Sequence, residues 1–440
     1  MFKKKFKSLD KNYTAEIFLK KPDKYREIEK ISSSLDNIIT MGSCNSYTPA
    51  SFKEDNVSID LKKFNRIIEF DKENRLITVE AGIKLSELLN FTLKHDLWLP
   101  QVPGYPTITI GGAVATNAHG KSCGYHGTIR KQIKKIFMFH KNHGWLKLSE
   151  DENKNIFDLT IGGLGLTGTI VHVQLKLKEF LGNSFITKVE ETTSSKDTIK
   201  KINLNHDKEI YYYSWNRTDG FNNFGKGFVF QNEVNLDKNI IKNKKISLYH
   251  ANIHNTFGMN LWNNFTIKLS QSFYYNFFKY LKKNEFNDNF QNAIFPYVGK
   301  EFYFKLFGNK GFLESQIIVP SEKIDVFIDE IENIYKKYSP NITLYSIKNF
   351  KGKCSDLKFE DDGICFTFDF IKNTKNIDFM EKLDKICEKY ELIPSIIKDS
   401  RLSLNTIKKC YKDYYNFKDK LYDFDNKRIY RSALSDRLNI

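Results

Sequence analysis

A glycine-rich stretch that is not a linker constrains this chain most. Residues 99–127, LPQVPGYPTITIGGAVATNAHGKSCGYHG, hold six glycines among apolar side chains. Glycine has no Cβ, so its backbone can approach a flat or charged ligand closely. The alternating run at 107–110, directly before Gly111 and Gly112, predicts a short strand. An apolar wall, a tight backbone and nearby polar tips suit a large planar cofactor with a phosphate tail. A glycine-rich buried hairpin is the alternative.

Two more turns of small residues fall within the first 170 residues. Residues 37–40 (NIIT) predict a strand that runs into residues 41–47 (MGSCNSY), where backbone N–H groups can converge on an anion. Residues 163–168 satisfy G-x-G-x-x-G, the dinucleotide fingerprint. That motif needs a following helix, whereas residues 169–178 alternate with period two and predict a strand, so we reject a Rossmann interpretation. Three such turns indicate a backbone-lined cleft for an extended ligand.

Composition favours a globular protein of two or three domains. The chain has 440 residues, 40% of them hydrophobic and 28% charged. No stretch approaches the ~18 consecutive apolar residues of a membrane span, and the basic N-terminus lacks the apolar segment of a signal peptide. The six cysteines are scattered without metal-ligand spacing, which favours free thiols and no metal site. We therefore expect a cytoplasmic location.

The net charge of +16 has two interpretations. A basic protein can bind nucleic acid, an anionic membrane surface or an anionic substrate. The lysines are spread along the whole chain, however, which favours a compositional bias. No nucleic-acid-binding motif is present and the basic residues are not clustered, so we expect no nucleic-acid partner. A weak attraction to anionic lipid would accompany the bias.

Residues 180–390 differ from the first part, with more Phe, Tyr, Asn and Lys and few glycine turns. Periodicity predicts strands at 211–215, 228–231, 312–319 and 365–370 and helices at 324–337 and 379–390. This order fits a second α+β domain, in which an antiparallel sheet carries helices on one face.

Five motifs resemble those of FAD-linked oxidases of the vanillyl-alcohol-oxidase type. They are residues 42–47 (GSCNSY), 102–121 (VPGYPTITIGGAVATNAHGK), 161–170 (IGGLGLTGTI), 308–320 (GNKGFLESQIIVP) and 398–401 (KDSR). Within that family they are most similar to oxidases of polyprenyl-phosphoryl pentoses. The resemblance implies an α+β fold with a two-part PCMH-type FAD-binding domain. Residues 1–178 would form that domain, residues 179–390 a substrate domain with an antiparallel sheet, and residues 391–440 a segment that completes the FAD site.

The resemblance also implies which residues hold FAD. The first loop wraps the pyrophosphate, the central stretch lines the flavin, and the backbone near Ile170 holds the adenine side. The implied FAD-binding residues are Met41, Gly42, Ser43, Cys44, Asn45, Ser46, Tyr47, Gly104, Thr109, Ile110, Gly111, Gly112, Thr116, Asn117, Ala118, His119 and Ile170. Many relatives attach the flavin covalently through a histidine in the first loop, where this chain has Asn45. An amide cannot form that bond, so we predict noncovalent FAD.

Catalytic and substrate-binding residues are implied by the same motifs. Lys398 matches the active-site lysine of the family, where an ammonium stabilises the negative charge of a reduced flavin. His119 and Tyr47 are the other catalytic candidates, and Gln316, Lys348, Thr367 and Lys398 are the substrate-binding candidates. For His119 the alternative is a hydrogen-bonded structural histidine, and for Lys398 a surface lysine. The substrate part departs from the relatives: Thr367 replaces a cysteine, Cys365 an asparagine and Glu314 a glutamine.

The implied activity is oxidation of a sugar hydroxyl to a ketone, with hydride transfer to the flavin. The most similar chemistry is 2′-oxidation of a polyprenyl-phosphoryl pentose, the first half of an epimerisation that a short-chain reductase partner would complete. A lipid-linked substrate would place the protein peripherally at the inner face of the membrane. The alternatives are an aldonolactone or alditol oxidase that acts on a soluble sugar and, from another class, a basic nucleic-acid-binding protein.

Overall fold

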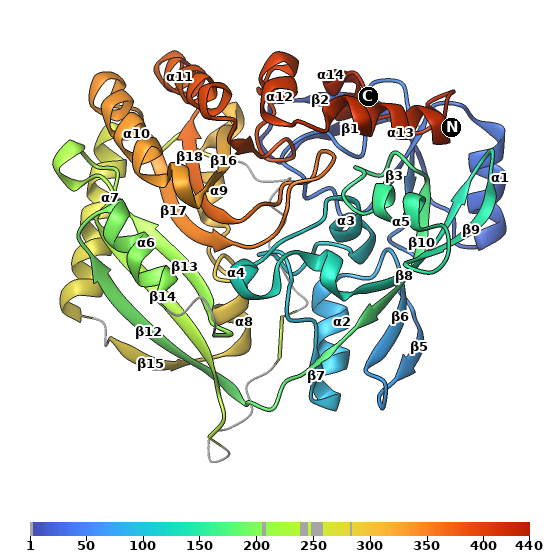
Figure 1. The fold of residues 1–440 in the computed structure, drawn as a ribbon, viewed down its shortest axis with the longest axis horizontal. Helices are drawn as coiled ribbons and strands as arrows, with labels where there is room; N and C mark the ends of the chain where they lie inside the picture. The colour runs from blue at the N-terminus through green and yellow to red at the C-terminus, as the bar shows by residue number, and fades with distance from the viewer. Residues whose placement is uncertain (1–2, 205–207, 238–244, 248–257, 282–283) are drawn as a thin grey trace.

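In the computed structural model, two halves that each contain helices and strands lie side by side (Figure 1). The structure describes residues 3–204, 208–237, 245–247, 258–281 and 284–440. The fold is α+β. In the first half, the sheet order β1-β2-β4-β3 comprises β1 (Lys3–Lys7), β2 (Thr14–Lys20), β4 (Val57–Asp60) and β3 (Ile38–Met41). Strands β2 and β3 both run parallel to β4, because helix α1 (Tyr25–Ser34) carries the chain across between them. The basic N-terminus forms the edge strand β1, and edge lysines discourage further strand pairing.

The second sheet of this half is antiparallel throughout and carries the third glycine turn. Its order is β5 (Ile67–Asp71), β6 (Leu76–Glu80), β10 (Thr169–Lys176), β8 (Ile133–His140) and β9 (Gly144–Ser149). Strand β10 follows the turn at residues 163–168 directly, which confirms that the fingerprint stands before a strand and not a helix. The turn itself needs glycine, because Gly162, Gly165 and Gly168 all have positive φ.

The central stretch folds differently from the sequence prediction. The strand predicted at 107–110 is wrong, because helix α3 (Ile110–Ala115) begins there. Thr109 is its N-cap, and the Thr109 hydroxyl accepts a hydrogen bond from the N–H of Gly112. The remaining short elements around it are α2 (Leu85–Thr92), β7 (Leu97–Trp98), α4 (Cys123–His126), α5 (Lys154–Thr160) and β11 (Lys178–Glu179).

Two antiparallel sheets build the second half. One has the order β13 (Tyr211–Asn216), β14 (Gly227–Asn235), β12 (Ser184–Thr192), β15 (Glu285–Asp288), and the other β17 (Ile342–Phe350), β18 (Gly363–Ile371), β16 (Phe312–Pro320), β19 (Ile393–Pro394). The helices of this half are α6 (Ser195–Asn203), α7 (Asn264–Asn276), α8 (Phe290–Ile294), α9 (Phe302–Lys305), α10 (Ile324–Tyr338) and α11 (Thr374–Tyr390). The predicted strands and helices of this region are all confirmed, and the single predicted sheet is in fact two.

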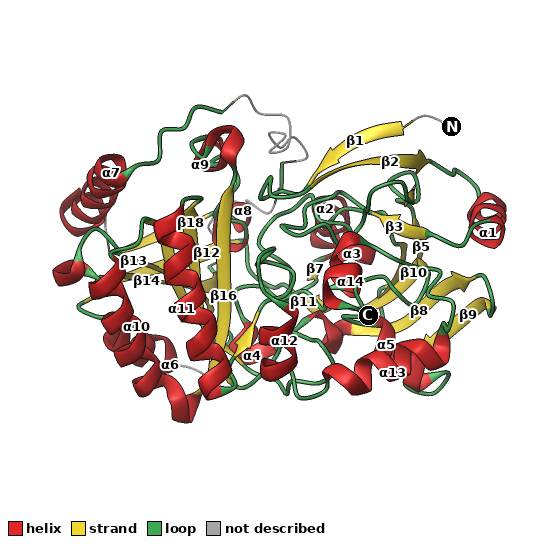
Figure 2. Cartoon of the chain, turned by 90° about the horizontal axis from the view of Figure 1, so that it is seen from above, coloured by secondary structure: helices red, strands yellow, loops and turns green. Residues whose placement is uncertain are grey.

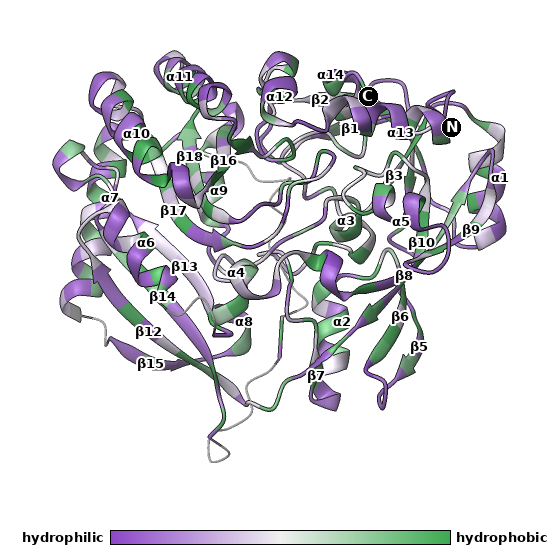
Figure 3. Ribbon diagram, in the orientation of Figure 1, coloured by the Kyte–Doolittle hydropathy of each residue, from purple (hydrophilic) through white to green (hydrophobic). Residues whose placement is uncertain are grey.

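Helices α10 and α11 cover one face of the β16–β18 sheet (Figure 2). The buried side of α10 presents Phe327, Ile331 and Tyr335 at helical spacing, whereas its charged residues face solvent. Colouring by hydropathy shows the same alternation of hydrophilic and hydrophobic segments along α6, α10 and α11 (Figure 3). The opposite face of the sheet is therefore left to line a cavity.

The C-terminal segment returns to the first half. It contains α12 (Leu404–Cys410), α13 (Tyr414–Phe424) and α14 (Ala433–Leu438). Tyr430 bridges to Ile38 of β3, and the N–H of Arg431 donates to the carbonyl of Ile38. The C-terminal segment therefore packs on the half that the first part of the chain forms (Figure 1). The domain boundaries at residues 178 and 390 stay a prediction. Within the described ranges, no helix is both long and apolar enough to cross a bilayer.

Candidate functional site: a cavity between the two halves

A cavity of about 340 Å³ lies where the three glycine turns meet the β16–β18 sheet. Its volume is within the usual range of cofactor and ligand pockets. The predicted site residues that line it are Met41, Gly42, Ser43, Cys44, Asn45, Ser46, Tyr47, Gly104, Thr109, Gly111, Gly112, Thr116, Ala118, His119, Ile170, Gln316, Lys348, Thr367 and Lys398. Two predicted residues do not: Ile110 lies in the apolar core, and the Asn117 amide donates to Glu360 at 2.8 Å. The predicted turns and the distant Lys398 thus converge on one cavity.

The first loop has the donors that a pyrophosphate takes. In the described part of the chain, no backbone N–H from Gly42 to Tyr47 donates to another protein group. The Ser43 hydroxyl is also buried without a described partner. Cys44 adopts a positive φ of 58°, which turns the loop around the cavity. The loop side chain Asn45 is already engaged, because its amide donates to Thr107 at 2.7 Å.

Glycine residues leave parts of this wall without side chains, so a flat ring can approach the backbone there. A Cβ on Gly104 would meet no atom within 4 Å, so this backbone faces open space in the cavity. A Cβ on Gly42 would lie 2.3 Å from Thr109 Oγ1, so the first loop packs directly on the start of α3. Free N–H groups at one end and bare backbone at the other fit FAD: the first loop would hold the pyrophosphate, and Gly104 would adjoin the flavin ring.

The opposite wall is the polar face of three neighbouring strands. Residues two apart on a strand share a face, and the cavity is lined by Glu314 and Gln316 of β16, Leu344, Ser346 and Lys348 of β17, and Thr367 and Asp369 of β18. Glu314 is register partner of Asp369, and Gln316 of Thr367. This wall gives a bound molecule hydroxyl, amide, carboxyl and ammonium groups within one sheet face.

His119 is a neutral acceptor in this site. The Lys348 ammonium donates to His119 Nδ1 at 3.0 Å, so the ring carries its proton on Nε2. Burial, together with the nearby charges of Lys348, Lys398 and Lys121, holds the pKa of His119 well below its usual range. Phe350 and Phe359 pack against the ring. The ring is therefore both packed and hydrogen-bonded, as the structural alternative for His119 expects.

Two lysines of the cavity have no carboxylate partner among the described residues. Lys121 Nζ lies over the rings of Tyr213 and Tyr297, at 4.9 and 5.8 Å from their centroids. Burial and the charge of Lys348 lower the pKa of Lys121 to about 7. In the part of the chain that the structure describes, neither Lys121 nor Lys348 forms an ion pair with an acidic side chain. An anion from outside the protein would stabilise the charged form of these half-buried lysines.

Lys398 lies beside the first loop and the polar wall. Its ammonium is 3.6 Å from the centre of the Tyr47 ring and 3.4 Å from Glu314 Oε1. Burial, followed by the charge of Glu314, raises the pKa of Tyr47 well above its usual range, so the phenol stays protonated. The surface-lysine alternative for Lys398 is wrong, because only 23% of this side chain is exposed and it points at cavity residues.

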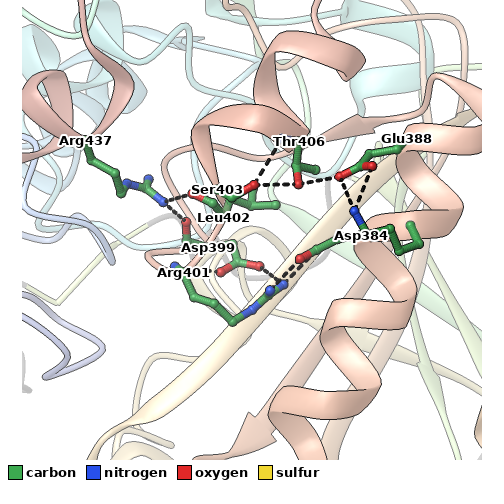
Figure 4. Close-up of polar contacts among 9 residues, drawn as sticks. Asp384, Glu388, Asp399, Arg401, Leu402, Ser403, Thr406 and Arg437 are labelled. Carbon is green, nitrogen blue, oxygen red and sulfur yellow. Dashed lines mark hydrogen bonds and ion pairs between the residues drawn. The ribbon is translucent and has the colours of Figure 1, made fainter.

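A hydrogen-bond network fixes the segment that carries Lys398 (Figure 4). Arg401 pairs with Asp384 of α11 at 2.5 and 2.8 Å and with Asp399 at 2.8 Å. Arg437 of α14 donates to the carbonyls of Asp399 and Leu402, both at 3.0 Å. The KDSR motif thus works as a unit in which the arginine and aspartate anchor the lysine.

The carboxyl pair Glu314 and Asp369 was not predicted as part of the site. Both are buried and face each other across β16 and β18, and Tyr303 donates to Asp369 at 2.8 Å. Burial and the charge of Glu314 raise the pKa of Asp369 well above its usual range, so the pair holds one proton. The sequence held a signal for this pair. Glu314 stands two residues before Gln316, and Asp369 two residues after Thr367, so each shares a strand face with a predicted site residue.

Comparison with known proteins identifies the first half. Residues 18–146 match the family model of the FAD binding domain. The chain is 26% identical over 392 residues to decaprenylphosphoryl-β-D-ribose oxidase of Mycolicibacterium smegmatis, across 85% of this chain and 83% of that protein. It is 29% identical over 165 residues to L-gulonolactone oxidase of Mus musculus, across 37% and 36%. It is 26% identical over 156 residues to mitochondrial L-galactono-1,4-lactone dehydrogenase of Brassica oleracea, across 35% and 26%.

These matches and the geometry agree. The family model ends near Leu146, and the free N–H groups, bare glycines and α3 that it covers are the features that fit a flavin nucleotide. The chain therefore carries an FAD-binding domain of the PCMH type, takes FAD as its cofactor and is an FAD-dependent oxidoreductase.

Proposed function

We propose that this enzyme oxidises a secondary hydroxyl of a phosphoryl-linked sugar to a ketone, and that its substrate is the 2′-hydroxyl of a polyprenyl-phosphoryl pentose. The observation that carries the proposal is the pair of half-buried lysines, Lys121 and Lys348, without an acidic partner in the described chain. A phosphodiester provides an anion that complements such a pair. The similarity to a ribose oxidase over most of the chain supports the same substrate class.

The polar wall can orient the sugar. FAD, when bound, would supply the acceptor for the hydride of the carbinol carbon. The Lys398 ammonium can donate a hydrogen bond to the oxygen of the hydroxyl that reacts. Glu314, whose Oε1 lies 3.4 Å from Lys398 Nζ, can receive the proton that this hydroxyl loses. The Thr367 hydroxyl and the Gln316 amide lie on the same sheet face, where they can bind the neighbouring hydroxyls.

A soluble aldonolactone or alditol is the second candidate substrate. Its support is the likeness to the lactone oxidases, which covers only about a third of this chain. A neutral lactone would leave the charges of Lys121 and Lys348 without a counter-ion. The structure therefore favours the anionic sugar.

Product analysis tests the choice directly. The purified, FAD-loaded enzyme is incubated with a short-chain polyprenyl-phosphoryl pentose and, separately, with free L-gulono-lactone and free pentose. We expect a 2′-keto product from the phosphoryl sugar alone. Turnover of the lactone, with none of the phosphoryl sugar, would overturn the proposal.

A reductase partner follows from the chemistry of that product. A 2′-ketone is the substrate that a reductase of the short-chain class would convert to the epimeric alcohol. Adding such a reductase and its nicotinamide cofactor to the reaction should yield the 2′-epimer. Accumulation of the ketone in the presence of the active reductase would argue against an epimerising pair.

A further inference from the structure

Helix α7 (Asn264–Asn276) is apolar on two faces, and the described part of the chain covers only one of them. Its inner face packs Ile267 and Gln271 into the second half, and the centre of the Tyr274 ring lies 4.4 Å from that of Trp215, at a tilt of 49°. Its outer face carries Phe265, Leu269 and Phe273 at a spacing of four residues. These three side chains are 72%, 60% and 71% exposed. A surface helix normally presents polar residues to water, so the outer face of α7 indicates a missing apolar neighbour.

The apolar surface extends beyond the helix. The segment that leads into α7 exposes Met259 and Leu261, and the π-helical segment that continues α7 (Phe277–Leu281) exposes Tyr280. The leading segment runs along α9, because the N–H of Leu261 donates to the carbonyl of Leu306 and the Trp262 indole to that of Tyr303. Phe302 at the start of α9 is likewise exposed.

We define the outer apolar face by the residues of this surface. They are Met259, Leu261, Phe265, Leu269, Phe273, Tyr280 and Phe302.

The helix that carries this face has charges of one sign. Residues 258–281 contain Lys268 and Lys279 and neither aspartate nor glutamate. Lys268 is exposed on α7, and Lys279 follows the helix, where it pairs with Glu191 at 3.1 Å. A second copy of this chain, at a net charge of +16, would bring lysines against lysines. An anionic lipid surface complements both the charge and the apolar side chains.

Helix α9 connects this face to the substrate wall. Phe302 points outward, whereas Phe304, two residues on, lines the cavity. Between them, the Tyr303 hydroxyl reaches Asp369 and Thr343, at 2.8 and 2.6 Å. Helix α9 therefore contributes both to this face, through Phe302, and to the lining of the cavity, through Phe304.

We propose that the outer apolar face docks the enzyme on the surface of an anionic bilayer, with α7 lying in the head-group layer. This inference rests on the proposed function for its purpose, because docking there would bring a lipid-linked sugar to the cavity. The contact itself depends only on the apolar side chains and lysines of α7 and its flanks.

Vesicle flotation tests the docking. The full-length FAD-loaded protein is mixed with vesicles of phosphatidylcholine alone or of phosphatidylcholine with phosphatidylglycerol. We expect flotation with the anionic vesicles and little with the neutral ones. The triple variant Phe265→Ser/Leu269→Ser/Phe273→Ser should partition about tenfold more weakly or worse, because three large apolar side chains are lost from the contact. Lys268→Glu should weaken binding to anionic vesicles only.

Matched controls separate this face from general stickiness. Leu181→Ser/Tyr422→Ser removes two side chains that are equally exposed, at 71% and 59%, but lie elsewhere. That variant should float like the wild type. Flavin absorbance and the thermal midpoint confirm that each variant is folded.

Three outcomes would overturn the docking proposal. They are wild-type protein that does not float with anionic vesicles, a triple variant that floats as well as the wild type, and a concentration-dependent dimer that the triple variant abolishes while vesicle binding is absent. Activity on a detergent-dispersed short-chain substrate keeps the two proposals apart. The triple variant should retain it, and a wild type that floats without oxidising that substrate would contradict the proposed function and leave the docking intact.

Discussion

Replacing Glu314 by glutamine should make this protein more stable at neutral pH and remove part of its pH dependence. Glu314 and Asp369 face each other in a buried wall and hold one proton between them. Because the folded-state pKa of Asp369 lies above that of the unfolded chain, the folded protein holds a proton that the unfolded chain has already released at neutral pH. The resulting stability is fully present below the unfolded carboxyl pKa and is lost as pH rises through the folded one.

The magnitude follows from one proton. Within that window the free energy of unfolding falls by about 1.4 kcal/mol per pH unit, or roughly 3 kcal/mol over two units. In Glu314→Gln the amide keeps the shape and can still accept from Gln316, whose side chain now donates to Glu314 at 2.8 Å. Asp369 can then ionise near Lys398 without a facing carboxylate. The variant should therefore equal the wild type below the ordinary carboxyl pKa and exceed it increasingly as the pH rises through the raised pKa of Asp369.

Urea unfolding of wild type and variant at a series of pH values measures this difference. Glu80→Gln is the matched control, since Glu80 is also buried. Although burial opposes it, hydrogen bonds from Arg66 and Tyr25 hold the pKa of Glu80 below its usual range. Its loss should destabilise the protein at neutral pH, by an amount that shrinks as pH falls toward 4. A Glu314→Gln effect that is constant with pH, or a destabilisation at pH 8, would refute the shared proton.

Three further outcomes are expected. Acid precipitation should release FAD into the supernatant, because Asn45 cannot bond the flavin; flavin that stays with the pellet would contradict this. Lys348→Met should lower kcat/KM for a phosphoryl sugar by about 10- to 100-fold, as expected for a lost charged hydrogen bond, and that for a neutral sugar by far less; steady-state kinetics would expose an equal loss. Gly42→Ala should lower the flavin content of purified protein, because its Cβ would lie 2.3 Å from Thr109 Oγ1; unchanged flavin-to-protein absorbance would speak against that packing.

The cofactor side of the site could be predicted from sequence because its chemistry is local. The first loop and the turn at 163–168 each hold small residues in consecutive positions, so one window of the chain shows both the turn and its use. Period-two alternation after Gly168 was enough to reject a Rossmann helix, and β10 confirms it. Lys398 was found by motif resemblance alone, because it is far from the glycine turns in the sequence. Its place beside them depends on contacts with α11 and α14, which the sequence does not show.

Residues 107–110 show where local pattern fails. Four alternating residues fit a strand or a capped helix start equally well, and the hydroxyl of Thr109 decides in favour of the helix only because Gly112 N–H lies in reach. The carboxyl pair could not be predicted from sequence for a different reason. Each strand was predicted, but Glu314 meets Asp369 only through the register of β16 on β18, between which the chain forms α10 and β17.

The arrangement of charge in the cavity connects these observations. Lys121 and Lys348 stand with His119 at one part of the substrate wall, and Lys398 stands with Glu314 and Asp369 at the other. Since the first group has no acidic partner in the described chain, it is suited to an anion that the substrate brings. The second group already balances one ammonium with one shared negative charge, so it is suited to neutral hydroxyls. The phosphoryl sugar that we propose as substrate carries an anionic group and hydroxyls together, whereas a free lactone has no anionic group.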